Sequence, residues 1–308
     1  MNTFEQLLER DDPVILDGGL ATQLESMGHN IDGELWSAKL LLSDPRAIID
    51  AHLAYLEAGA QIIVSASYQA SRAGFMAEGL TAEEADALID SSVKLAREAR
   101  DEFLATNPSA LRPLVAASVG PYGATVHDGS EYTGIYKIDD DALGAFHSER
   151  LRLLDQSGAD LLAVETIPNF REAQILSDLL DDAATPAWVT FACRDDRNLS
   201  DGARLWAAAG LFAEHPNVLA LGVNCTAPTH ISALIEEVAA AAPDKKIVVY
   251  PNSGETYHST DNSWSGDACD LDSNFDVDGW RKAGATLIGG CCRIGPGDIA
   301  AIKARLLN

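Results

Sequence analysis

Two adjacent cysteines near the end of the chain, Cys291 and Cys292 in LIGGCCRIGPGDI, are the side chains best suited to metal or thiol chemistry. A third, Cys225, follows an apolar run in GVNCTAP. Three thiolates suit a soft metal ion, and zinc is the commonest such ion. Three protein ligands leave a fourth position open, which is the pattern of catalytic zinc. A cysteine at a strand end is also often a small buried hydrophobic residue, so position alone leaves metal binding and packing both open.

The other two of the five cysteines are predicted to lie outside such a site. Cys193 ends an apolar run and is expected to pack in the core, whereas Cys269 lies in an acidic segment and is expected to be exposed. The N-terminus, MNTFEQLLERDDP, is polar and acidic, unlike a signal or transit peptide. The predicted location is therefore the cytoplasm, where cysteines indicate metal binding, catalysis or packing rather than a disulfide framework.

Two carboxylates also follow apolar runs, Asp17 in ILDGG and Glu165 in VETIPN. Each could accept hydrogen bonds from backbone amides or cap the next helix. If both face one site, they could instead bind an ammonium group beside the metal and hold an amino acid. The seven histidines are scattered without ligand spacing, and none is assigned to the site.

Composition narrows the classes of partner. The 308 residues carry a formal net charge of −25, and Lys245-Lys246 is the only lysine pair. Nucleic acid is excluded, because phosphate binding requires clustered Lys and Arg. Hydrophobic residues make up 47%, enough for a substantial core, and no apolar segment approaches the length of a membrane span. Small molecules are the expected partners, and the oligomeric state is left open.

The elements that must position these side chains are eight short apolar runs alternating with longer amphipathic segments. The runs show little polar alternation, as expected for parallel strands buried on both faces. They are Val14–Asp17, Gln61–Ser65, Leu114–Ser118, Leu161–Glu165, Ala187–Ala192, Val218–Asn224, Ile247–Pro251 and Thr286–Gly290. Helices are predicted after Ser43-Asp44-Pro45, from the Thr81 capping box to about Ala105, and at Asp140–Gln156, Phe170–Asp182, Ala203–Glu214, Thr229–Ala242, Val277–Ala283 and Gly297–Leu307.

Eight strands, each followed by a helix, predict one α/β domain over residues 1–308, a (β/α)8 TIM-type barrel. A doubly wound open sheet is the rival fold, but Asp17-Gly18-Gly19 does not match the dinucleotide-binding pattern G-x-G-x-x-G. The longest segment without predicted structure, residues 253–276, is interpreted as an active-site loop.

In such a barrel, side chains at the carboxyl ends of the strands surround the active site. The two carboxylates and the three metal-site cysteines all occupy such ends. Neighbouring residues on a regular strand point in opposite directions, which would keep Cys291 and Cys292 apart. Gly289-Gly290 and Gly295-Pro296-Gly297 allow the backbone to leave strand geometry there.

These strand-end segments, taken in order, resemble the homocysteine S-methyltransferase family over essentially the whole chain. GVNC followed by GGCC is highly specific, whereas DGG alone would be a weak match. The resemblance is carried by ILDGGLATQLE (Ile15–Glu25), ELWSA (Glu34–Ala38), SASYQA (Ser65–Ala70), ASVGPYGA (Ala117–Ala124), GSEYTGIY (Gly129–Tyr136), VETIPN (Val164–Asn169), GVNCTAP (Gly222–Pro228), YPNSGE (Tyr250–Glu255) and GGCCR (Gly289–Arg293).

The resemblance implies a zinc-dependent barrel enzyme that methylates L-homocysteine to methionine. Cys225, Cys291 and Cys292 match the three zinc ligands that carry the catalysis. Asp17 and Glu165 match the carboxylates that engage the homocysteine amino group. The other matching positions are the amides that would take its carboxylate, around Ser65, Ala66 and Ser67, and two residues that would shape the pocket, Asn224 and Tyr250.

The expected methyl donor is a sulfonium compound. SEYTGIY and ELWSA resemble the smaller family members, which use S-methylmethionine or S-adenosylmethionine, and the chain has no room after the barrel for cobalamin or folate modules. Trp36, Tyr132 and Trp264 could attract a sulfonium cation. Alternatives are a betaine-type donor and a selenocysteine or selenohomocysteine acceptor. Readings of another class are a non-catalytic zinc or thiol sensor and a metal-free lyase using Asp17 and Glu165 as acid and base.

Overall fold

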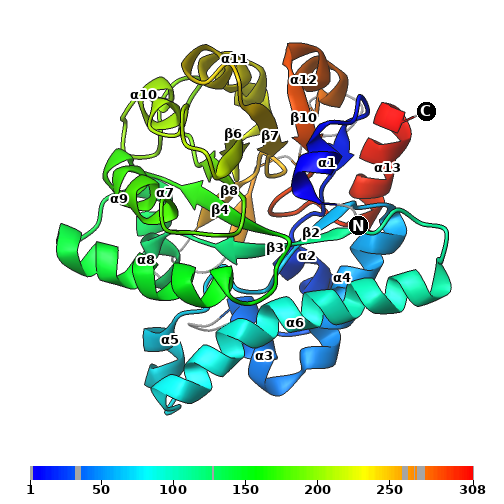
Figure 1. Ribbon diagram of the computed structural model, residues 1–308, viewed down its shortest axis with the longest axis vertical. Helices are drawn as coiled ribbons and strands as arrows, with labels where there is room; N and C mark the ends of the chain where they lie inside the picture. The colour runs from blue at the N-terminus through cyan, green and yellow to red at the C-terminus, as the bar shows by residue number, and fades with distance from the viewer. Residues whose placement is uncertain are drawn as a thin grey trace.

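The computed structural model describes residues 3–31, 36–126, 128–258, 263–266, 268 and 275–307. Its centre is a nearly closed barrel of eight parallel strands in the order β1-β10-β7-β6-β5-β4-β3-β2 (Figure 1). Between β1 and β2, Leu16 and Ile62 form a parallel bridge. The predicted strands and TIM-type barrel are confirmed, and the strands are β1 (Val14–Ile15), β2 (Ile62–Val64), β3 (Leu114–Val119), β4 (Leu161–Ile167), β5 (Ala187–Phe191), β6 (Val218–Asn224), β7 (Lys246–Tyr250) and β10 (Ala285–Ile288).

Helices surround the barrel and follow its strands. They include α4 (Pro45–Ala58), α6 (Ala82–Thr106), α8 (Asp140–Asp155), α9 (Phe170–Leu180), α10 (Leu205–Gly210), α11 (Ile231–Ala241), α12 (Val277–Ala283) and α13 (Pro296–Leu307). The predicted capping box is present, because the Thr81 side chain accepts from Glu84 N and the Glu84 carboxylate accepts from Thr81 N. Within the described ranges, no helix is long and apolar enough to cross a membrane.

Side-chain alternation along the strands divides the core into two parts. On β4, Leu161 and Ala163 belong to the cluster inside the barrel. Leu162 and Val164 belong to the larger cluster between the barrel and its helices. The next inward position on this strand is Glu165, so the same alternation that buries apolar side chains lower down directs a carboxylate inward near the strand end.

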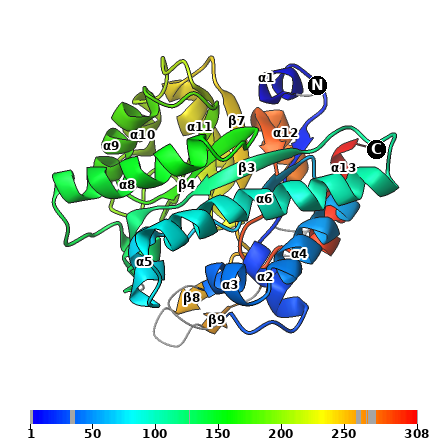
Figure 2. The same ribbon diagram turned by 60° about the horizontal axis from the view of Figure 1, so that its bottom comes forward.

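A short helix, α1 (Phe4–Leu8), covers the amino-terminal end of the barrel. Its buried side chains Phe4, Leu7 and Leu8 join the interior cluster. The Phe4 ring meets Trp188 edge-on, with ring centroids 6.1 Å apart. Figure 2 shows α1 at one end of the barrel and the hairpin of β8 (Thr256–His258) and β9 (Ser263–Ser265) toward the other. Because α1 closes the amino-terminal end of the barrel, a binding site is expected at the carboxyl ends of the strands.

The sequence did not predict that hairpin, nor four short helices in the connections. The prediction that 253–276 lacks structure is corrected, since Tyr257 pairs with Trp264 in an antiparallel ladder. Cys269 and Glu34 lie outside the described residues. These four helices are α2 (Leu20–Ser26), α3 (Leu40–Ser43), α5 (Arg72–Ala77) and α7 (Ser130–Thr133).

Candidate active site

A cavity opens where the barrel strands end at their carboxyl side. Nine of the ten predicted site residues line it, and the tenth, Ser67, is buried beside Ser65. Among the described residues that line it are three acidic side chains, Asp17, Glu131 and Glu165, and no Lys, Arg or His. The cavity is therefore suited to cationic groups, and an anionic group bound there must find its hydrogen-bond donors elsewhere than on a basic side chain.

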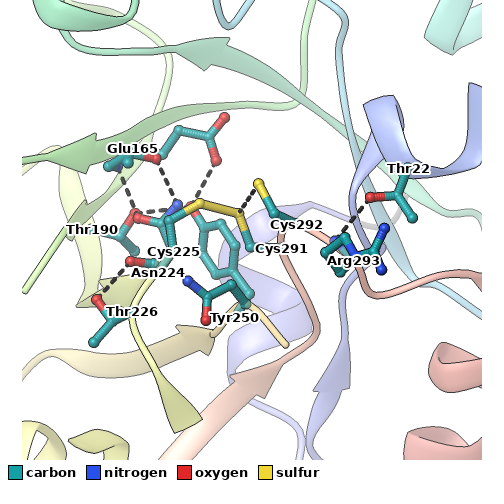
Figure 3. The surroundings of a disulfide bond; sticks show 12 residues. Thr22, Glu165, Thr190, Asn224, Cys225, Thr226, Tyr250, Cys291, Cys292 and Arg293 are labelled. Carbon is teal, nitrogen blue, oxygen red and sulfur yellow. Dashed lines mark hydrogen bonds between the residues drawn. A yellow bond between two sulfur atoms is a disulfide. The ribbon is translucent and has the colours of Figure 1, made fainter. Parts of the chain in front are cut away.

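The three predicted metal-site cysteines lie together at this cavity (Figure 3). Their Sγ atoms all lie within 4.8 Å of one another. Cys225 and Cys291, which are 66 residues apart in sequence, are joined as a disulfide, and Cys292 Sγ lies 3.9 Å from Cys291 Sγ. Cys193 is buried in the outer core and is not part of this group, which confirms its predicted packing role.

Backbone geometry explains how neighbouring cysteines reach one place. Strand β10 ends at Ile288, so Cys291 and Cys292 lie beyond the strand rather than on opposite faces of it. A Cβ on Gly290 would lie 2.2 Å from Ile294 Cγ2, so the glycine permits close packing of the turn. Cys225 and Arg293 adopt the left-handed backbone conformation, with φ of 46° and 71°. Such uncommon backbone at both cysteine turns is typical of functional sites.

The Cys291–Cys292 spacing suits a soft metal ion, and all three sulfurs can serve as ligands once the Cys225–Cys291 disulfide is reduced. Four ligands at about 2.3 Å around tetrahedral zinc would place sulfur atoms about 3.8 Å apart, close to the 3.9 Å between Cys291 and Cys292. Burial, together with the nearby carboxylates of Glu131 and Glu165, raises the pKa of the Cys292 thiol to about 12. With no basic side chain among the described lining residues, a divalent cation would supply the positive charge that three thiolates require.

Asp17 and Glu165 are both buried at the cavity. Val64 N donates to Asp17 Oδ2 at 2.7 Å, so the other carboxylate oxygen remains for a ligand. Glu165 accepts from Ser118 Oγ and, at 2.9 Å, from Tyr250 OH. Each side chain is thus held by neighbours that favour its charged form while it faces the cavity.

Burial opposes that charge. It raises the pKa of Glu165 to about 7, although the hydrogen bonds from Ser118 and Tyr250 lower it. Burial also raises the pKa of Asp17 well above its ordinary value, and the neighbouring Glu165 carboxylate adds to this rise. An ammonium ion between the two would relieve the desolvation and repulsion together.

Asn224 and Tyr250 connect the carboxyl ends of four strands, β4, β5, β6 and β7. Asn224 Oδ1 accepts from Thr166 N and from Thr190 Oγ1, each at 2.8 Å, and its Nδ2 donates to Thr166 Oγ1 at 2.7 Å. Tyr250 OH lies 2.9 Å from Thr190 Oγ1. The Asn224 oxygen accepts two hydrogen bonds and its Nδ2 donates one, so this side chain holds Glu165 on β4 and Cys225 after β6 in fixed relative positions.

The loop after β2 presents backbone amides to the cavity. Ser65 N is already engaged, because it donates to Ala116 O at 2.9 Å. For the following amides, from Ala66 N to Gln69 N, no described residue supplies an acceptor. The predicted set of amides was Ser65 to Ser67, whereas the amides without an acceptor in the described chain are those of Ala66 to Gln69.

Several cavity residues were not predicted from the sequence. Tyr68, Gln69 and Thr166 belong to strand-end segments expected to surround the site, but no role of their own was predicted for them, and all three line the cavity. Glu131 belongs to the quoted GSEYTGIY segment, and burial raises its pKa to about 7. The predicted Tyr132 also lines the cavity, whereas the side chains of Trp36 and Trp264 lie outside the described part of the chain.

Comparison with known proteins agrees with this geometry. The family model described as homocysteine S-methyltransferase matches residues 14–306. Homocysteine S-methyltransferase of Escherichia coli (strain K12) is 47% identical over 99% of this chain and 98% of its own length. Crystal structures of the Escherichia coli homocysteine methyltransferase MmuM in a metallated and an oxidized form each superpose with a TM-score of 0.88 at 46% identity, covering 99% of this chain and 100% of that one. The chain belongs to the homocysteine S-methyltransferase family.

Proposed function

We propose that this protein transfers a methyl group from a sulfonium donor to the sulfur of L-homocysteine, with Zn²⁺ held by Cys225, Cys291 and Cys292. The observation that supports this most directly is the convergence of three cysteine sulfurs within 4.8 Å at a cavity lined by two buried carboxylates. Bound zinc would keep the sulfur of homocysteine deprotonated near neutral pH, where a free thiol with a pKa of about 8.5 is mostly protonated.

The amino acid end of homocysteine fits the remaining groups. Asp17 and Glu165 accept hydrogen bonds from its ammonium group, which compensates their burial. The free amides after Ser65 take its carboxylate, since no described lining residue carries a basic side chain. Holding both ends fixes the direction of the sulfur, and orientation supplies much of the advantage in a transfer between two substrates.

The acidic cavity favours a cationic methyl donor such as S-methylmethionine or S-adenosylmethionine. Glu131 and Tyr132 line the cavity, and a carboxylate and an aromatic ring both attract a sulfonium ion. In the transfer, the homocysteine thiolate forms a bond to the methyl carbon while the donor's S–C bond breaks and its electron pair stays on the donor sulfur. A thiolate and a sulfonium ion thus become two neutral thioethers, and the thiol proton leaves to solvent.

The direct test is methionine formation from L-homocysteine by the reduced, zinc-loaded protein. S-methylmethionine, S-adenosylmethionine and betaine are supplied in parallel, and L-selenocysteine replaces homocysteine in a further arm. We expect turnover with a sulfonium donor and little with betaine. Homocysteine and zinc binding without turnover would identify a sensor instead, and full activity in protein shown to be zinc-free would contradict the proposed metal.

The pH dependence of homocysteine use is expected to follow Glu165, whose pKa burial raises to about 7. Below that pH the carboxyl is protonated and cannot pair with the ammonium group, so kcat/KM should rise as the pH increases through about 7. Kinetics of the free enzyme report this step in kcat/KM. 4-Mercaptobutanoate, which lacks the amino group, is the control, and an identical rise with that acceptor would contradict the assignment.

A further inference from the structure

Arg150 on α8 is a buried charge without an acidic partner in contact. Its side chain is 1% exposed, yet no ion pair of the described residues includes its guanidinium, and Glu172, which is paired with His147, acts on it only from beyond salt-bridge distance. The Phe146 ring covers it, 5.1 Å from Cζ to the centroid. Buried arginines are ordinarily paired with an acid, because an unpaired buried charge is costly. This exception needs a reason that packing alone does not supply.

The guanidinium is bound instead to three backbone carbonyls from two loops at the carboxyl end of the barrel. Nη1 donates to Gly120 O at 2.8 Å, in the loop after β3. Nη2 donates to Ser67 O at 2.9 Å and to Tyr68 O at 3.0 Å, in the loop after β2, where Ser67 O also accepts from Ala70 N at 3.1 Å. These are the loops that border the cavity, but Arg150 itself does not line it.

These contacts fix the direction of two amide groups. In a trans peptide the N–H points opposite to the C=O of the same unit, and the described chain has no cis peptide bond. The carbonyls of Ser67 and Tyr68 point at Arg150, so the N–H groups of Tyr68 and Gln69 point away from it. Tyr68 and Gln69 line the cavity, and no described residue accepts from either amide.

We propose that Arg150 is the positioning residue for the carboxylate of the amino acid substrate: it holds the Ser67 and Tyr68 peptides so that the Tyr68 and Gln69 amides face the cavity. Its charge also lies behind those peptides and balances the anion across them. A carboxylate that enters a cavity lined by Asp17, Glu131 and Glu165 requires such a compensating charge, and the described lining residues contain none. This role rests on the proposed homocysteine methyl transfer.

The test compares Arg150→Lys with wild type using two thiols. Lysine keeps the charge but lacks the planar fork that reaches three carbonyls at once. The KM for homocysteine should rise about tenfold, with kcat changed less than about twofold. The inhibition constant of 3-aminopropane-1-thiol against homocysteine should stay within about twofold, because this compound is homocysteine without its carboxylate.

A matched control is Arg100→Lys. Arg100 is another buried arginine, 5% exposed, but it contacts Asp160 at 3.3 Å, and Asp160 precedes β4 at the far end of the barrel. This variant should leave unchanged the ratio of the KM for homocysteine to the inhibition constant of 3-aminopropane-1-thiol. If Arg150→Lys does not fold by circular dichroism, Arg150→Gln is judged by the same ratio.

Three outcomes overturn the proposal. If Arg150→Lys weakens the binding of homocysteine and of 3-aminopropane-1-thiol equally, or changes neither, Arg150 does not act on the carboxylate. Failure of both Arg150 variants to fold, with Arg100→Lys folded, would assign the residue to stability alone. A wild-type protein that forms no methionine would instead contradict the proposed methyl transfer, so the two failures are distinguishable.

Discussion

Replacing Cys292 by serine is expected to remove the bound metal and to lower methyl transfer to homocysteine by roughly 10³-fold or more. Cys292 is one of three sulfurs that converge within 4.8 Å, and a serine hydroxyl is too weak an acid to replace a thiolate ligand. The loss combines two effects. The homocysteine thiol returns to its ordinary pKa, and its sulfur is no longer held in line with the methyl group. Zinc content and methionine formation, measured on the same reduced preparations, check this result.

Cys193→Ser provides the matched control. Cys193 lies two residues after β5. Its backbone N donates to the hydroxyl of Thr226, the residue that follows Cys225, yet its sulfur is not part of the three-cysteine group. Cys193→Ser should keep one zinc per chain and most of the activity, with at most reduced stability from a polar atom in the core. If Cys292→Ser keeps its zinc and its turnover, the three-thiolate site is wrong.

Removal of the metal should also expose the site to oxidation. Cys225 and Cys291 are close enough to be joined as a disulfide, which removes two of the three thiolates. Chelator-treated wild type exposed to air should therefore lose activity, and reductant with zinc should restore it, whereas zinc alone should not. Recovery with zinc alone would show that this pair does not form when the metal is absent.

Much of the site could be predicted, because the order of the strands and the alternation of side chains along them determine which residues meet at the carboxyl end of the barrel. Placing Cys225 at the end of the sixth strand and Cys291-Cys292 after the eighth puts a single strand between them, and the sulfurs do converge. The same period turns Glu165 inward, in register with Leu161 and Ala163. These inferences required only residue type, side-chain alternation and the rule that barrel sites lie at the carboxyl ends.

Other parts depend on features that residue type does not determine. The direction of the amides after β2 depends on single peptide planes, and these planes are held by Arg150 on α8, which donates to the Ser67 and Tyr68 carbonyls, and by Ala70 N, which donates to Ser67 O. The predicted carboxylate-binding amides included Ser65 N, which instead donates to Ala116 O in the sheet. They did not include the amides of Tyr68 and Gln69, because residue type does not show the direction of a peptide plane. The β8–β9 hairpin was missed because Ser263 and Ser265 flank its tryptophan and show little strand propensity.

Replacing Glu165 by glutamine is expected to raise the KM for homocysteine by about 10²-fold or more, the usual cost of removing one partner of a buried charge pair. Glutamine keeps the shape of the side chain but presents an uncharged amide to the substrate ammonium group. The hydrogen-bond network can adapt, since Tyr250 OH can turn toward Thr190 Oγ1, 2.9 Å away. The fold and the metal site should therefore survive, and unchanged zinc content would show that they do.

The acceptor 4-mercaptobutanoate makes this prediction specific, because it is homocysteine without the amino group. Wild type should use it poorly, and Glu165→Gln should use it about as well as wild type, within roughly threefold. Combining Asp17→Asn with Glu165→Gln should then cost less than the sum of the single effects, since both carboxylates serve one ammonium ion. If Glu165→Gln weakens both acceptors equally, Glu165 acts through its bonds to Ser118 and Tyr250 rather than on the substrate, and the ammonium group must be held by Asp17 alone.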